Sequence, residues 1–188
     1  KFKLMNIHNN IYPLSENFYK STRKKLLNLI HEKNLDGCLV TNPANIFYFT
    51  GFFYVTNERP SGFYLSKNNK TKLFIPLLEK ENAESLNVDE INIYEEFPGE
   101  ISPFSFMANH ISEKNVGTDI TNIGILNLLE NKFNTLNHNT GLESFRFEKL
   151  DEEIELITIA SKYADIAIEY LKDNAKELIN QNADERTL

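Results

Sequence analysis

The chain has 188 residues, of which 41% are hydrophobic and 25% are charged, a composition typical of globular rather than disordered proteins. Its formal net charge of -7 argues against nucleic-acid binding, because nucleic-acid-binding proteins present a clustered basic face. The one basic cluster, Arg23-Lys24-Lys25, lies in a helical pattern and is predicted to be a solvated helix face. We therefore expect no nucleic-acid partner.

Cysteine content and hydropathy indicate the cellular compartment in which the protein is expected. Cys38 is the only cysteine, which excludes a disulfide within the chain, and its apolar neighbours predict a buried thiol. No apolar run approaches the roughly 18 residues of a membrane span. Residues 1–10 hold too few apolar side chains for a signal peptide. We expect a soluble, cytoplasmic protein without a membrane partner.

The N-terminal third begins with a lead-in over residues 1–14, followed by a helix. Ser15 suits the N-cap of this helix, which is predicted to end near Asn34. Residues 37–41 form a short apolar run that predicts a buried strand. In the next segment, NPANIFYFTGF, Asn42 and Pro43 suit the cap and first position of a short helix, and Thr50-Gly51 ends it.

The middle of the chain alternates between strand and helix patterns. Strands are predicted over 62–66 and 72–77, and the turn KNNK between them indicates an antiparallel hairpin. Helices are predicted over 79–86, 102–112 and 122–131, strands over 91–94 and 116–119, and one more strand is possible within 134–142. This order predicts an α/β fold with a mixed β-sheet flanked by helices.

The last segment differs from the rest. Residues 151–180 read as one long helix whose apolar residues form two stripes, and so wide an apolar arc needs partners on two sides. Asp184 and Glu185 suit the start of another helix. We therefore expect an α/β domain over residues 15–148, and in residues 149–188 the first helix and linker of a truncated second domain.

A search for catalytic motifs leaves one candidate. HExxH, GxGxxG, GxxxxGK[ST] and GxSxG are absent, and no two of the four histidines have the spacing of a metal-ligand pair. Arg59 is predicted to lie in a loop beside Pro60 and near aromatic residues. An arginine in such a loop could bind a carboxylate through two hydrogen bonds, or it could be an ordinary surface arginine on a turn.

Several runs together resemble the N-terminal domain of the creatinase, prolidase and aminopeptidase P family. They are LDGCLVTNPANIFYFTGF, ERPSGFYL, LFIP, VGTD and KLDEEIELITIASKYADIAI. The first is similar to the family pattern ending in NIxYxTGF. The last is similar to the family helix KSxxEIxxIRxAxxIxDxA, with Asp151 in place of a common Ser. The resemblance covers residues 15–188.

The resemblance implies a function for a longer protein. Such a protein would carry a C-terminal pita-bread metallopeptidase domain, here truncated, with two divalent metal ions (Mn, Co or Zn) that activate a water for attack on the bond preceding proline. The long helix would begin that domain. Because the family's metal ligands lie in that domain, the resemblance implies that this chain alone binds no catalytic metal or cofactor and is inactive.

The resemblance also implies partners. This domain would gate substrates and build a homodimer, contacting its own catalytic domain and proline-containing peptides. Tyr48, Phe52 and Arg59 would line the substrate cleft of the partner subunit in trans. Alternatives stay open: dipeptidase or aminopeptidase activity, a non-catalytic peptidase-like binding protein, or a creatinase-type amidinohydrolase.

Overall fold

The computed structural model describes residues 14–54, 58–95, 99, 101–138, 140–181 and 184. Two units can be distinguished, one over Leu14–Glu148 and one that contains the residues from Lys149 onward. Each is described by itself below.

The first unit is built around a six-stranded mixed sheet with the strand order β4-β3-β2-β1-β5-β6. The strands are β1 (Gly37–Val40), β2 (Gly62–Ser66), β3 (Thr71–Pro76), β4 (Glu90–Tyr94), β5 (Asn115–Thr118) and β6 (Thr135–Asn137). β2 runs antiparallel to β1 and β3, whereas β4 is parallel to β3, and β5 is parallel to both β1 and β6. This confirms the predicted mixed sheet and the hairpin, and it includes the additional strand.

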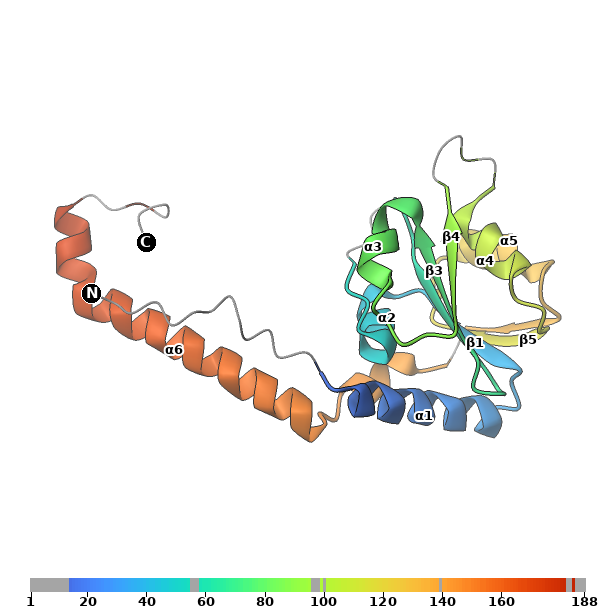
Figure 1. Ribbon diagram of the computed structural model, residues 1–188, viewed down its shortest axis with the longest axis horizontal. Helices are drawn as coiled ribbons and strands as arrows, with labels where there is room; N and C mark the ends of the chain where they lie inside the picture. The colour runs from blue at the N-terminus through green and yellow to red at the C-terminus, as the bar shows by residue number, and fades with distance from the viewer. Residues whose placement is uncertain are drawn as a thin grey trace. The chain divides into compact units, whose positions relative to one another are not determined.

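Helices cover the sheet, as Figure 1 shows. They are α1 (Glu16–Glu32), α2 (Pro43–Thr50), α3 (Lys80–Ala83), α4 (Pro103–Asn109) and α5 (Ile123–Glu130), with 3-10 helices η2 (Leu77–Glu79) and η3 (Leu142–Arg146). The helix predicted over 79–86 is therefore a 3-10 turn followed by one turn of α-helix.

The core follows the period-two alternation of the strands. Leu39, Tyr64 and Phe74 point toward α4 and α5, where they join a buried cluster with Met107 and Leu129. Cys38, as predicted, is fully buried, and burial raises the pKa of its thiol. A thiol held in its protonated form is a poor nucleophile.

The prediction of a solvated basic face on α1 is wrong for Arg23. Only 8% of Arg23 is exposed, and its guanidinium donates to the carbonyl oxygens of Tyr19 (3.2 Å) and Asn87 (2.6 Å). Burial lowers the pKa of Arg23, opposed by the nearby charges of Asp89 and Glu16. Arg23 thus joins α1 to the segment before β4.

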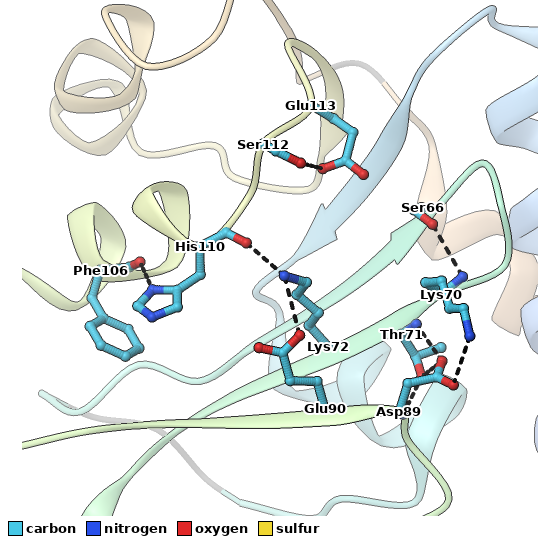
Figure 2. A network of polar contacts seen from close by, with 10 residues as sticks. All are labelled: Ser66, Lys70, Thr71, Lys72, Asp89, Glu90, Phe106, His110, Ser112 and Glu113. Atoms are coloured by element: carbon cyan, nitrogen blue, oxygen red, sulfur yellow. Dashed lines mark hydrogen bonds and ion pairs between the residues drawn. The ribbon is translucent and has the colours of Figure 1, made fainter.

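A polar network joins β3 to the edge strand β4 and to the end of α4 (Figure 2). The Asp89 carboxylate accepts from Thr71 N and Oγ1, both at 2.8 Å, and Thr71 Oγ1 accepts from Asp89 N. Lys72 Nζ lies 3.2 Å from Glu90 Oε2 and donates to the carbonyl of His110. These contacts hold the first residue of β4 in register and place charges along the sheet edge, where they oppose pairing with other chains.

The second unit contains α6 (Asp151–Asn180), the predicted long helix. Its N-terminal turn carries three acidic residues, which suit the positive end of the helix dipole. No residue of α6 is buried in this chain, and side chains from both predicted stripes, such as Tyr163 and Ile157, are about half exposed. The helix start predicted at Asp184-Glu185 lies almost wholly outside the described residues.

Candidate functional site around α2

The segment after β1 forms helix α2, with both ends fixed by side chains or backbone geometry. The side chain of Asn42 accepts from Ala44 N at 2.9 Å and Asn45 N at 3.4 Å, and Pro43 occupies the first turn, as predicted. At the other end, Gly51 adopts φ 80° and donates to the carbonyl of Phe47. This left-handed conformation favours glycine, which explains why the helix ends in Thr-Gly.

A single carboxylate anchors the start of α2. Asp119, which follows β5, is 9% exposed and accepts four hydrogen bonds: from Thr41 N (2.7 Å), Thr41 Oγ1 (3.0 Å), Asn42 N (3.1 Å) and Asn45 Nδ2 (2.9 Å). Because β1 and β5 are parallel neighbours, their carboxyl ends meet at one edge of the sheet, which brings Asp119 to the start of α2. The position of α2 is therefore fixed by the sheet.

Tyr48 and Phe52, two of the three predicted cleft residues, lie in the interior of this unit. Tyr48 is 4% exposed, packs its ring edge-on against Phe18, and donates its hydroxyl to the carbonyl of Phe145 at 2.9 Å. Phe52 is 2% exposed. In this chain both side chains are buried and do not form part of the surface.

Two other aromatic residues of the same segment are exposed. Phe47 is 37% exposed and Phe53 is 72% exposed, and their rings pack edge to face with centroids 5.7 Å apart. We call Phe47 and Phe53 the aromatic pair. The helical register contained a signal for Phe47, because it lies three residues after the exposed Ala44, opposite the buried Ile46 and Phe49. Phe53 follows the helix, and no periodicity marks it.

Arg59, the third predicted residue, lines a surface hollow of about 290 Å³. The hollow is lined by Glu58, Arg59, Tyr94, Glu95, Gly99, Ile101, Ser102 and Pro103. The Tyr94 hydroxyl donates to the carbonyl of Pro60, which fixes the loop that carries Arg59 to the end of β4. The structure thus places Arg59 at the surface, where a guanidinium flanked by carboxylates and an aromatic ring can bind a small polar group.

The described residues do not fit a metal centre. No group of three or more His, Cys, Asp or Glu side chains in this part of the chain is arranged to hold a metal ion. No described helix is long and apolar enough to cross a membrane.

Comparison with known proteins identifies the domain. Residues 23–155 match the family model of the creatinase/prolidase N-terminal domain. An uncharacterized peptidase of Staphylococcus aureus (strain bovine RF122 / ET3-1) is 25% identical over 178 residues, covering 87% of this chain and 48% of the relative. The chain therefore spans about half the length of the curated relatives that it matches.

Solved structures show the same fold. A proline dipeptidase from Streptococcus pneumoniae is 24% identical, with a TM-score of 0.56 that covers 67% of this chain and 97% of that one. An Xaa-Pro dipeptidase from Bacillus anthracis is 18% identical, with a TM-score of 0.66 that covers 82% of this chain and 43% of that one. The mixed sheet, its flanking helices and the matched residues lead to one conclusion: this chain belongs to the creatinase/prolidase N-terminal domain family.

Proposed function

We propose that this chain is the substrate-gating and dimerising N-terminal part of a longer Xaa-Pro peptidase of the dipeptidase or aminopeptidase type. The family match carries this proposal, and the names of the relatives, a peptidase and two dipeptidases, support its reaction class. The relatives' greater length supports a catalytic domain that follows α6.

We assign the two divalent ions, and with them the hydrolysis, to the proposed catalytic domain, as the family resemblance implies. This chain alone would then be inactive. Its contribution is a shaped surface, and in the proposed homodimer that surface faces the cleft of the partner subunit.

The aromatic pair and Arg59 are the groups we assign to that surface. An exposed edge-to-face pair would give an apolar wall for a proline ring, and we assign Arg59, which lines the surface hollow, to the recognition of a peptide carboxylate. Tyr48 and Phe52 are buried in the same segment and do not form part of that wall. An apolar wall together with a carboxylate-binding arginine would favour short peptides. The C-terminal carboxylate of the peptide would reach the arginine only when it lies one residue beyond the scissile bond.

A substrate panel with the full-length protein tests the reaction class. The protein is loaded in turn with manganese, cobalt and zinc and offered Xaa-Pro dipeptides, Xaa-Pro tripeptides, matched Xaa-Ala peptides and creatine. We expect hydrolysis of the Xaa-Pro peptides only. Hydrolysis of creatine would favour the amidinohydrolase alternative, and binding of Xaa-Pro peptides without hydrolysis in every metal would favour a non-catalytic binding protein.

A further inference from the structure

A polar connection runs from the sheet through α2 to the end of the first unit. The side-chain amide of Asn45 donates through Nδ2 to Asp119 and accepts through Oδ1 from Arg146 Nε at 2.9 Å. Asn45 is 1% exposed, so its hydrogen bond to Asp119 is buried, and its hydrogen bond from Arg146 is partly buried. An amide suits this place because it carries a donor and an acceptor on one rigid group, and neither a carboxylate nor a leucine offers both.

A second contact joins the same two segments. The hydroxyl of Tyr48 donates to the carbonyl of Phe145, and the Phe145 ring packs edge-on against Phe49 with centroids 6.2 Å apart. Phe145 and Arg146 belong to η3, about a hundred residues further along the chain, in a stretch where sequence periodicity predicts no helix. Two hydrogen bonds and a ring contact therefore hold the end of η3 against α2.

η3 lies at the end of the first unit. η3 ends at Arg146, and the first unit ends at Glu148, so η3 is the last element before the chain passes into the second unit. Helix α2 carries Phe47 of the aromatic pair. The contacts therefore connect α2, the helix that carries Phe47, to the point where the chain leaves the first unit.

We infer that Asn45 and Arg146 are positioning residues that make the aromatic pair and the exit of the chain one rigid piece. We name the Asp119–Asn45–Arg146 connection, together with the Tyr48–Phe145 hydrogen bond, the α2–η3 latch. The latch holds α2 against η3, so Phe47 keeps a fixed setting relative to the point where the chain leaves the first unit. The role of this setting in substrate selection rests on the proposed function, whereas the mechanical coupling does not.

Hydrogen–deuterium exchange on the 188-residue chain tests the coupling. The Arg146→Ala variant removes one contact of the latch. The Glu143→Ala variant is the matched control, because Glu143 lies in the same 3-10 helix and is exposed. In Arg146→Ala we expect amides of both α2 and residues 145–148 to exchange roughly tenfold faster, the change that loss of one charge-assisted hydrogen bond produces. The amides of α4 and α5 and the control should be unchanged. Faster exchange confined to residues 144–148 would overturn the inference.

A kinetic test addresses the consequence for substrates. In the full-length protein, Arg146→Ala should raise KM for an Xaa-Pro dipeptide severalfold and change kcat less than about twofold, because only positioning is lost. Arg146→Lys, which retains a donor, should have a KM between those of Arg146→Ala and the unmodified protein. Equal KM values for Arg146→Ala and Glu143→Ala would overturn the positioning role. If the unmodified full-length protein hydrolyses no Xaa-Pro peptide, the proposed function fails, and the exchange experiment still decides on the latch.

Discussion

Gly51 shows how one residue sets the end of α2. A β-carbon at this position would lie 2.9 Å from the Tyr19 ring, and the backbone has φ 80°. Gly141 is a matched control, since it has φ 71° but no atom within 4 Å of an added β-carbon. We expect Gly141→Ala to cost about 1–2 kcal/mol for the left-handed backbone alone. Gly51→Ala should cost roughly 1–3 kcal/mol more, for the clash.

Urea unfolding of both variants measures the difference. Equal losses of stability would show that the Tyr19 ring can move aside without a loss of free energy. The close contact would then not be the reason for glycine at position 51.

Asp119 is the second test at the residue scale. Its removal in Asp119→Ala leaves the amides of Thr41 and Asn42 and the side chain of Asn45 without their acceptor. We expect a loss of roughly 2–4 kcal/mol in the free energy of unfolding, because buried donors without partners are costly. Glu130→Ala, at an exposed end of α5, should stay within about 0.5 kcal/mol of the parent chain. A similarly small change for Asp119→Ala would mean that water replaces the carboxylate at little cost.

Individual residues were predictable where local rules decide. Ser15, Asn42 and Pro43 act as caps or first-turn residues because their chemistry fits those places wherever the chain leads. The burial of Arg23 depends on the Asn87 carbonyl, which lies 64 positions away, so no local pattern reveals it. The exposure of Phe47 follows the helical register of α2, whereas no local pattern marks the exposed Phe53.

At the scale of elements, the carboxylates directly before β1 and β4 predict a dependence of stability on pH. Hydrogen bonds from Thr71 lower the pKa of Asp89, and the ammonium of Lys67 with the amide of Asn115 lowers that of Asp36, both below the ordinary value of 3.8. A carboxylate with a lowered folded-state pKa stabilises the fold at pH values above its unfolded pKa. That stability is lost as the pH falls through the folded value.

The chain should therefore lose stability as the pH drops below about 3.8, and Asp89→Asn should show a smaller loss over the same range. Urea midpoints at pH 7, 4 and 3 measure this. Because the Asp89 side chain is 47% exposed, we expect a modest difference. An Asp89→Asn variant with the full pH dependence of the parent chain would exclude this carboxylate as a cause.

Helix α6 gives the other prediction at this scale. Its isoleucines and tyrosines are exposed among the residues that the structure describes, and contiguous apolar surface promotes association. We expect the 188-residue chain to form larger species in sedimentation velocity than a chain that ends at Glu148. The double variant Ile157→Glu/Ile168→Glu, which changes two exposed positions, should behave like the shorter chain. A 188-residue chain that stays monomeric at its highest soluble concentration would contradict this prediction.

Elements with a strong period and clear end signals were predictable, and short ones were not. α1, the β2–β3 hairpin and α6 combine apolar periodicity with caps or turns, and their positions agree with the sequence to within a few residues. η3 has too few residues to show a period and begins at a left-handed Gly141, so its existence depends on contacts with α2. The latch could not be predicted for the same reason.

At the scale of the whole molecule, the chain belongs to an identified family and has a proposed role. The family accounts for the sheet, its flanking helices and the length relative to the curated peptidases. The gating role depends on surface residues, the aromatic pair and Arg59, which the fold presents but does not by itself assign to a substrate. A test of the central claim must therefore change this surface and read out substrate choice.

The most direct measurement is the ratio of kcat/KM for an Xaa-Pro dipeptide to that for an Xaa-Pro tripeptide in the full-length protein. It is compared between Phe53→Ser, Arg59→Ala and the exposed control Lys24→Ala on α1. We expect Phe53→Ser and Arg59→Ala each to shift the ratio by roughly tenfold, the size expected for loss of one specific contact. Lys24→Ala should leave the ratio unchanged. If all three variants keep the ratio of the unmodified protein, this domain does not gate the substrate.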